Sequence, residues 1–424
     1  MTRRSSPAYL HFKTRSNRRF PFRAVAVVLV VLIVLAGAGA IRAFTESTPG
    51  LTVQRVLPAS VVLDGRRPAP AWPAVGEAAV EVEGLPPLGS SGPDRPLPIA
   101  SVAKIMTAYV VLRDHPFSAD QGGFAVTVSA ADVADFQARL AQQQSVVAVR
   151  EGEILSELQL LEGLLVGSGN NIGTILAEHD AGSVPAFVAR MNATARQLGL
   201  SHTTYTDPSG LASTTVSTAA DQLLLAAQAM AVPVFARVVA MRTVDVPVAG
   251  TLVNFNRAVG TDGYVGIKTG SDATAGGCLV FANDEKVSGR TITILGVVLG
   301  QDAGQRLTTD LTTAALKAAN ALVHSVIAAV AVRTLVPAGT VVAVIANGSG
   351  AKVNAATIQP LTAVGFGGLT VPIVVTISRL GDQLSAGETV ASVRSAVAEN
   401  GATAATATSS MPGPTWRWRL SHIF

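Results

Sequence analysis

A long run of helical sequence lies between two groups of β-strand patterns, and this order limits the fold more than any other feature. From Ser101 to about Ala240, apolar residues recur at helical intervals. The strand patterns on either side of that run are at 59–65, 78–83, 264–269, 277–283 and 290–299. A further helix is predicted at 305–327. Strands at both ends of a helical block predict one sheet with helices packed on it, in an α+β domain over 59–328.

The sequence changes character after this domain. Residues 330–397 are rich in β-branched side chains interrupted by glycines, which predicts a small all-β domain. Residues 398–424 are predicted to be a low-complexity linker and a tail in which Trp416 and Trp418 alternate with arginines. That composition suits a membrane interface, and an unstructured tail is the alternative.

Positive charge is concentrated at the start of the chain. Residues 1–23 hold seven lysines and arginines and no acidic residue. Removing those seven charges from the net charge of +4 leaves −3 for the rest of the chain. The high isoelectric point therefore describes a short tail, and we expect no nucleic-acid partner.

An uncharged segment of 18 residues, 24–41, follows the basic tail. Its length is near the lower limit for a membrane span. A basic flank before an apolar segment places residues 1–23 in the cytoplasm and everything after Arg42 outside, with 42–58 as a stalk. A signal peptide cleaved near the small residues 36–40 is the alternative, and the protein would then be secreted. Both interpretations export the rest of the chain.

The stretch Ser101-Val102-Ala103-Lys104 opens the helical run. A serine and a lysine three residues apart lie one turn apart on the same helix face, where the amine reaches the hydroxyl. Burial among apolar neighbours lowers the pKa of an amine, and a neutral amine can take the proton of the serine. The pair is therefore a candidate nucleophile and base, although Ser-x-x-Lys alone is a common pattern.

Two more stretches carry residues of the same chemistry. Ser168-Gly169-Asn170 offers a hydroxyl that can relay a proton and an amide that can bind a substrate backbone. Lys268-Thr269-Gly270-Ser271 places a cation and hydroxyls on a predicted strand, where they can hold a carboxylate. Ser-x-x-Lys and Lys-Thr-Gly are a known pair of motifs in penicillin-binding proteins and class A β-lactamases.

With these motifs in this order, the chain resembles the low-molecular-mass penicillin-binding proteins, the serine D-alanyl-D-alanine carboxypeptidases of peptidase family S11. The resemblance covers about residues 60–325. Its further motifs are Leu176-Ala177-Glu178-His179, Phe187-Val188-Ala189-Arg190-Met191-Asn192, Leu198-Gly199-Leu200, Asn256-Arg257, Ala275-Gly276-Gly277-Cys278 and Arg306. The resemblance implies a penicillin-binding, β-lactamase-like transpeptidase domain, an antiparallel sheet with helices on it, followed by a small all-β domain.

The resemblance also implies a role for each candidate residue. Ser101 would attack the carbonyl between two D-alanines of a peptidoglycan stem pentapeptide, with Lys104 as its base and Ser168 as a proton relay. Asn170 would orient the substrate amide. The terminal carboxylate would be bound by Lys268 and Thr269, and the backbone N–H groups of Ser101 and Ser271, beside Gly270, would form the oxyanion hole. The expected inhibitors are β-lactam antibiotics.

Two departures from the family pattern are present. Ser271 follows Lys-Thr-Gly where several relatives carry histidine, which leaves its side-chain role open. Asn171 follows Asn170 where aspartate is frequent, a change that we expect to be structural. Arg306 is expected to form an ion pair that holds the fold, and Cys278 to serve packing.

Two other functions fit parts of the sequence. A β-lactamase needs a carboxylate base for deacylation, and no Glu-x-x-Leu-Asn occurs between Asn170 and Lys268. A catalytically inactive, membrane-tethered scaffold that binds the cell wall would not need the whole set of reactive residues. Endopeptidase activity on cross-links would use the same residues and stays open. No His/Glu spacing of a zinc site occurs, so we expect no metal and no cofactor.

Overall fold

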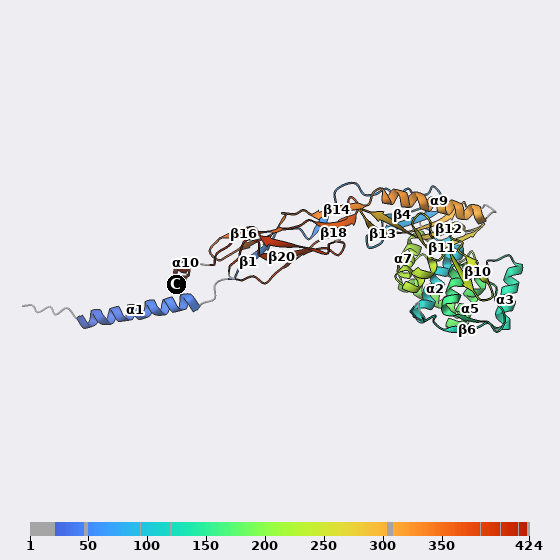
Figure 1. Ribbon diagram of the computed structural model, residues 1–424, viewed down its shortest axis with the longest axis horizontal. Helices are drawn as coiled ribbons and strands as arrows, with labels where there is room; N and C mark the ends of the chain where they lie inside the picture. The colour runs from blue at the N-terminus through green and yellow to red at the C-terminus, as the bar shows by residue number, and fades with distance from the viewer. Residues whose placement is uncertain are drawn as a thin grey trace, which may run out of the picture.

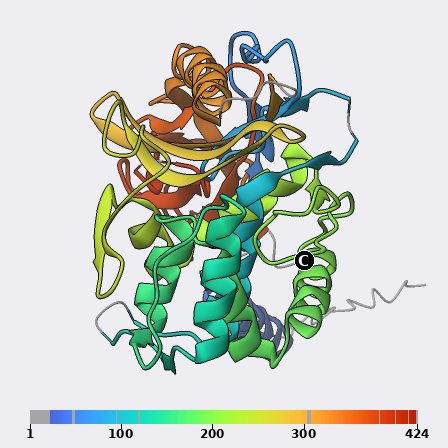
Figure 2. The same cartoon turned by 90° about the vertical axis from the view of Figure 1, so that its right-hand side faces the viewer.

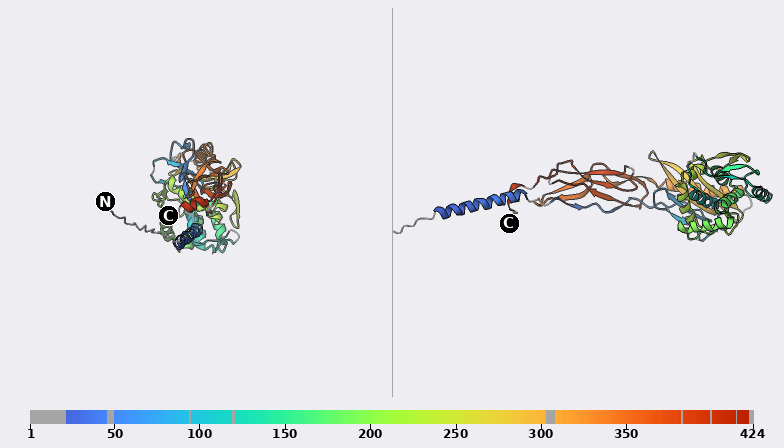
Figure 3. Two further views of the ribbon diagram at one scale, coloured as in Figure 1. Left: turned by 90° about the vertical axis from the view of Figure 1, so that its left-hand side faces the viewer. Right: turned by 90° about the horizontal axis from the view of Figure 1, so that it is seen from below.

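In the computed structural model, the protein is an elongated molecule with three parts arranged in line (Figure 1, Figure 3). The described residues are 22–45, 50–93, 95–118, 121–302, 308–381, 383–398, 400–413 and 415–421. An N-terminal helix stands at one end, an all-β module lies in the middle, and an α+β domain forms the other end. Arg306 and most of the basic tail predicted at 1–23 lie outside the described residues.

A five-stranded antiparallel sheet forms the centre of the α+β domain. Its strand order is β11 (Tyr264–Asp272), β12 (Gly276–Val287), β13 (Arg290–Gln301), β3 (Glu77–Val82) and β4 (Gly89–Ser91). The strand β11, which carries the Lys-Thr-Gly stretch, is therefore at the edge of the sheet. A tight turn at Ser288 and Gly289, both with positive φ, joins β12 to β13. The antiparallel sheet predicted from the resemblance is confirmed.

Helices cover both faces of this sheet and make three layers (Figure 2). Helix α9 (Thr308–Ile327) packs on β11, β12 and β13 from one side. On the other side, α7 (Ala219–Met230) packs on β3 and β13, and α8 (Pro233–Val239) packs on β11. A large apolar core fills the space between the sheet and the second group of helices. The α+β class and the helical run from Ser101 to about Ala240 are confirmed.

The helical block holds the remaining elements of this domain. Serine N-caps with capping boxes start two of its helices, at Ser129 and Ser156. The elements are β5 (Leu97–Pro98), the short 3-10 helix η1 (Ala100–Ala103), α2 (Lys104–Asp114), β6 (Ala125–Thr127), α3 (Ala130–Ala141), β7 (Ile154–Ser156), α4 (Glu157–Leu165), α5 (Asn170–Ala181), α6 (Val184–Gln197), β8 (Val216–Ser217), β9 (Thr243–Val246) and β10 (Gly250–Val253).

A six-stranded antiparallel sheet dominates the β module. Its order is β1 (Thr52–Arg55), β15 (Val341–Ala346), β16 (Lys352–Thr357), β21 (Ala402–Ala407), β20 (Thr389–Arg394) and β19 (Val374–Ile377). Two short pairs complete the module: β14 (Ala331–Val336) with β17 (Leu361–Gly365), and β18 (Thr370–Pro372) with β2 (Ser60–Val62). The prediction of an all-β region after Val330 is confirmed.

The sequence-based limits of this module are wrong at both ends. The predicted stalk 42–58 contains β1, which pairs with β15, and β2 pairs with β18 rather than with the sheet of the α+β domain. The predicted linker contains β21, which lies between β16 and β20. Its side chains alternate in burial, with Thr403, Ala405 and Ala407 inside. Small residues fit an inner strand, and their low complexity obscured this two-residue period.

The N-terminal helix α1 (Phe22–Thr45) includes the predicted apolar segment. Its residues Val25–Arg42 form a helix long and apolar enough to cross a membrane, and none of this window is buried against the rest of the protein. The short helix α10 (Trp416–Ser421) contains the predicted Trp/Arg tail and packs against α1 (Figure 1). The two described ends of the chain therefore meet on the same side of the β module.

Candidate active site

The local fold brings the predicted nucleophile and base together. Ser101 lies in η1, and Lys104 is the first residue of α2, so one helical turn separates them. The apolar residues around them are fully buried, which fixes this turn in the core. The Lys104 Nζ lies 2.7 Å from the Ser101 Oγ. Ala100, just before the nucleophile, has φ +44, a strained conformation for a residue other than glycine.

Lys104 is completely buried and surrounded by oxygen atoms. Its Nζ contacts the Oδ1 of Asn170 at 2.7 Å, the carbonyl oxygen of Ser209 at 3.3 Å and the Oγ of Ser168 at 3.5 Å. Burial, helped by the positive charge of Lys268, holds the Lys104 pKa well below its ordinary value. The lowered pKa favours the neutral amine, which can accept the proton of Ser101.

The junction between α4 and α5 supplies Ser168 and Asn170. Four of the five leucines of α4 are buried in the core, and Asn170 begins α5. Ser168 is buried and has φ +53, a conformation that disfavours side chains other than glycine. Strain at a residue of this kind is typical of functional sites. The Ser168 hydroxyl lies 3.5 Å from the Lys104 Nζ.

The edge strand β11 crosses directly in front of η1. A Cβ on Gly270 would lie 2.8 Å from the carbonyl oxygen of Ile99 and 2.9 Å from the backbone nitrogen of Ser101. Only glycine permits this approach, which holds the Gly270–Ser271 backbone beside the nucleophile. The strand thus brings the third predicted motif to the first two.

Lys268 lies beneath the surface of that strand. It is 2% exposed, and its Nζ donates to the carbonyl oxygen of Thr269 at 3.0 Å. Burial lowers its pKa to about 7. Lys268 is therefore expected to change charge near neutral pH, and its positive charge lowers the pKa of Lys104.

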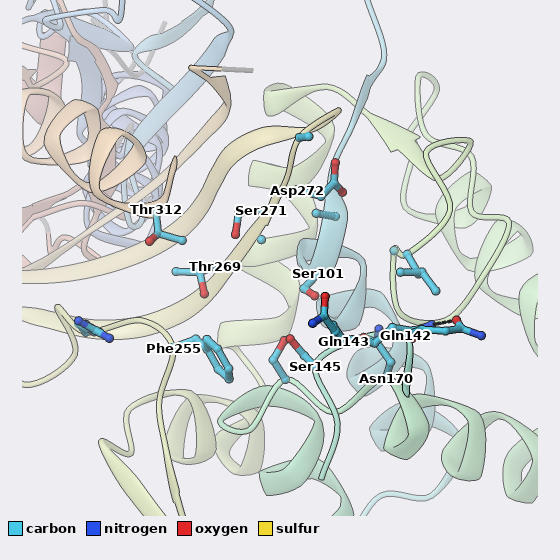
Figure 4. A pocket seen from close by; sticks show the side chains of 18 residues that line it. Ser101, Gln142, Gln143, Ser145, Asn170, Phe255, Thr269, Ser271, Asp272 and Thr312 are labelled. Atoms are coloured by element: carbon cyan, nitrogen blue, oxygen red, sulfur yellow. Dashed lines mark hydrogen bonds between the residues drawn. The ribbon is translucent and has the colours of Figure 1, made fainter. Parts of the chain in front are cut away.

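A cavity of about 520 Å³ opens in front of Ser101 (Figure 4). Of the predicted residues, Ser101, Ser168, Asn170, Thr269, Gly270 and Ser271 line it. Lys104 and Lys268 are buried out of contact with the cavity surface. All eight predicted residues are thus brought together, six at the cavity and two beneath it.

The cavity also has walls that the sequence did not identify. The further lining residues are Gln142, Gln143, Gln144 and Ser145, which follow α3, and Phe255, Arg257 and Thr312. Phe255 and Thr312 lie on the side of the cavity away from Gln142 (Figure 4). Except for Asn256-Arg257, which is part of the resemblance described above, no motif marks these residues, because they contribute to the cavity from loops and from α9.

A half-buried carboxylate shapes the loop behind Lys104. Asp207 accepts hydrogen bonds from the backbone N–H groups of Ser209, Gly210, Leu211 and Ala212. Burial opposes its ionisation, but these bonds outweigh burial and lower the Asp207 pKa. The turn that it closes presents the carbonyl of Ser209 to Lys104. The Asp-Pro-Ser-Gly sequence at 207–210 was a turn signal that could have revealed this loop.

Two structural expectations are confirmed. The side chain of Asn171 accepts from the backbone N–H of Val147 at 3.0 Å and donates to its carbonyl at 2.8 Å, so it holds the loop after α3. Cys278 is fully buried, and burial raises its pKa to about 12, as fits a packing residue. Within the described part of the chain, no three metal-ligating side chains lie close enough to hold an ion.

Comparison with known proteins places this chain among the DD-peptidases in sequence. The model of peptidase family S11, described as D-alanyl-D-alanine carboxypeptidase, matches residues 87–303. The chain is similar to the D-alanyl-D-alanine carboxypeptidase DacB2 of Mycobacterium tuberculosis, with 38% identity over 146 residues. That match covers 34% of this chain and 46% of DacB2, so less than half of this relative is spanned.

Solved structures match in fold. The Streptomyces K15 DD-transpeptidase has a TM-score of 0.50 and 29% identity, over 61% of this chain and 100% of that one. The D-alanyl-D-alanine carboxypeptidase DacD from Francisella tularensis has a TM-score of 0.54 over 82% of this chain and 96% of that one. Its identity is 20%, so this likeness shows the fold alone, across more than the α+β domain.

Proposed function

Because the chain belongs to the D-alanyl-D-alanine carboxypeptidase family of peptidase S11, we propose that it is a serine-type D-alanyl-D-alanine carboxypeptidase. Its substrates are peptidoglycan stem peptides that end in D-Ala-D-Ala, and β-lactams acylate it as mimics of that end. The observation that carries this proposal is the 2.7 Å contact between the buried amine of Lys104 and the hydroxyl of Ser101, behind the cavity.

Acylation uses the two residues of η1 and α2 together. The Ser101 Oγ forms a bond to the carbonyl carbon between the two D-alanines, and its proton passes to the Nζ of Lys104. The C–N bond then breaks, and the proton reaches the departing amine through Ser168, whose Oγ is 3.5 Å from Lys104. A positioned general base contributes about 10²–10⁴ in rate. Water later cleaves the ester and regenerates the serine.

Binding uses the edge strand β11. Lys268 and Thr269 hold the terminal carboxylate, and Asn170 orients the substrate amide. The backbone N–H groups of Ser101 and Ser271 stabilise the developing oxyanion, and each such donor is worth roughly 10²–10³ in rate. The close approach at Gly270 supports this assignment, since it brings these two backbone segments together.

A peptide assay tests the activity. The protein with a pentapeptide ending in D-Ala-D-Ala should release one equivalent of free D-alanine per peptide, and the Ser101→Ala variant should release none. Release from a Ser101→Ala protein, or the absence of release from the wild type, would show that the activity is misassigned. Fast turnover of penicillin by the wild type would instead favour the β-lactamase alternative.

The location and the domain limits are also proposals. Helix α1 retains the protein in the cytoplasmic membrane, and the cavity works outside it. The active domain extends from about β3 to α9, and the β module holds it away from the membrane. The exposed apolar length of α1 supports this topology. N-terminal sequencing of the native protein tests it: a mature chain that begins near Ile41 would show a cleaved signal instead.

A further inference from the structure

A chain of polar side chains leads from the active-site lysine to an arginine outside the predicted motifs. Asn170 accepts from Lys104 through Oδ1 at 2.7 Å, and its Nδ2 donates to the Oε1 of Gln144 at 3.0 Å. Arg139 on α3 donates through Nη1 to the same Oε1 at 3.2 Å. The Nε2 of Gln144 donates to Gln142 at 2.7 Å. Gln144, Gln142 and Arg139, the outer residues of this hydrogen-bonded series, do not belong to the three motifs.

Arg139 determines the donor-to-acceptor direction of this series of hydrogen bonds. A guanidinium has donors and no acceptor, so it can only meet the oxygen of the Gln144 amide. That oxygen in turn can only accept from Asn170, which must therefore turn its Nδ2 outward and its Oδ1 toward Lys104. With the Asn170 amide reversed, two oxygens would face each other at Gln144 and an N–H donor would face the amine.

This polarity matters because a neutral amine has two N–H donors and one lone pair. Asn170 Oδ1 and the carbonyl of Ser209 provide acceptors for the two donors, at 2.7 and 3.3 Å. The lone pair is then left for the hydroxyl of Ser101. A reversed Asn170 amide would donate to that lone pair and withdraw it from the nucleophile.

We propose that Gln144, itself oriented by Arg139, is a positioning residue that fixes the amide of Asn170 and so directs the lone pair of Lys104 at Ser101. The proposal rests on the proposed function, because it assigns Lys104 the role of base. Arg139 is itself held in place, since its Nε bonds to Asp135 at 2.7 Å and its Nη2 to Thr174 at 3.1 Å. The backbone N–H of Gln144 also donates to the carbonyl of Arg139 at 3.1 Å.

Three variants test the proposal through the rate at which penicillin acylates Ser101, followed by intact mass from pH 5 to 9. Gln144→Ala removes the acceptor, and acylation should slow at least tenfold, a part of the 10²–10⁴ that a positioned base supplies. Gln144→Glu keeps the acceptor, so its plateau rate should stay within about threefold of wild type. Gln159→Ala is the matched control, because Gln159 accepts in a helix cap outside the site; it should acylate at the wild-type rate.

The pH profile separates positioning from a merely structural role. The charged groups that act on Lys104 are Lys268 on β11, Asp207 in its loop and Arg139 on α3. Gln144→Glu adds a negative charge to this set and stabilises the protonated amine. The acid limb of acylation should therefore move up by about 1 pH unit, the effect of one charge across a partly buried site.

A readout independent of activity is the titration of Lys104 by NMR, practical because the chain has six lysines. Its midpoint should rise in Gln144→Glu and stay in place in Gln159→Ala. Wild-type acylation in Gln144→Ala, or an unmoved Lys104 midpoint in Gln144→Glu, would overturn the proposal. A wild-type protein that penicillin does not acylate would count against the proposed function, and the NMR midpoint would still decide the role of Gln144.

Discussion

The site contains two buried lysines with different surroundings. Lys104 has oxygen acceptors around its amine and touches the nucleophile, whereas Lys268 bonds to the backbone of its own strand. Burial lowers the pKa of both. The lowered pKa suits Lys104 to take a proton, whereas we expect Lys268 to meet the carboxylate of a substrate in its protonated form.

Alanine variants of the two lysines should fail in different ways. Lys104→Ala should abolish acylation and leave the affinity for a D-Ala-D-Ala peptide largely intact. Lys268→Ala should weaken binding of that peptide, because a charge-assisted contact is worth about 1.5–3 kcal/mol, or one to two decades in kcat/KM. With a peptide whose C-terminus is amidated, the variant should lose much less kcat/KM, since that peptide has no anion to meet the lysine. Steady-state kinetics on the two peptides measures the difference, and equal losses on both would disprove carboxylate recognition by Lys268.

The pKa of Lys268 predicts a pH dependence of binding. Burial lowers the pKa of Lys268 to about 7 in the protein without substrate. Its side chain is therefore mostly protonated at pH 6 and mostly neutral at pH 8. The affinity of Ser101→Ala protein for a free-acid peptide should fall by up to about tenfold over that range, as the cation is lost. Calorimetry should detect proton uptake on binding near pH 7.

Two controls accompany this titration. The amidated peptide should show no such fall, and Lys268→Arg should flatten the profile, because a guanidinium stays charged. If the affinity for the free-acid peptide does not change with pH in the protein that retains Lys268, this lysine does not bind the carboxylate.

At the scale of elements, we expect acylation to depend on how closely β11 passes η1. Gly270→Ala would place a methyl group 2.8–3.0 Å from three backbone atoms of residues 99–102. The strand must then move away from Ser101, and an oxyanion donor is displaced with it. Complete loss of one such donor slows a reaction by about 10²–10³, so acylation by this variant should slow by at least about tenfold. The midpoint temperature of thermal unfolding should also decrease.

Gly173→Ala in α5 is the matched control for that variant. Its added methyl would meet Leu164 at 3.5 Å and Pro208 at 3.6 Å, which are ordinary contacts. Alanine is better than glycine inside a helix by about 0.5–1 kcal/mol, so this variant should be as stable as the wild type or more so. Normal acylation by Gly270→Ala would contradict the role given to the β11–η1 contact.

Sequence patterns predicted the elements of the α+β domain better than the strands of the β module. Long helices and the strands β11, β12 and β13 have clear periodicity, and the three motifs identify residues that chemistry requires at the site. The cavity walls at Gln144 and Phe255 belong to loops whose sequence carries no motif, so only the fold shows them. Strand β1 pairs with β15, which is distant in the chain, and β21 pairs with the distant β16 as well as with the neighbouring β20. Short strands of small or polar residues do not reveal such pairing.

At the scale of the molecule, the β module ties both ends of the chain to the α+β domain. Strand β1 comes from the N-terminal side and β21 from the C-terminal side, and both belong to one sheet. The core of this module is continuous with the core under α9. The N-terminal helix α1 is therefore connected to a module that packs on the α+β domain (Figure 3).

Two truncations test the place of β21. A chain that ends after Val397 should lose the order of the β module, because β16 and β20 lose their shared neighbour. A chain that ends after Gly413 keeps β21 and the bridge between Leu384 and Met411, and should unfold like the full-length protein. Limited proteolysis and thermal unfolding distinguish the two. Equal protease resistance of both truncated chains would show that β21 is dispensable.

Covalent capture of Ser101 by a β-lactam is the most direct measurement of the proposed chemistry. After exposure to penicillin, the intact mass of the protein should increase by one drug molecule, and peptide mapping should locate the adduct at Ser101. Lys104→Ala should prevent the adduct, because the base that activates the serine is gone. An adduct at any other residue, or a wild-type protein with no adduct, would contradict a serine acyl-enzyme mechanism at this site.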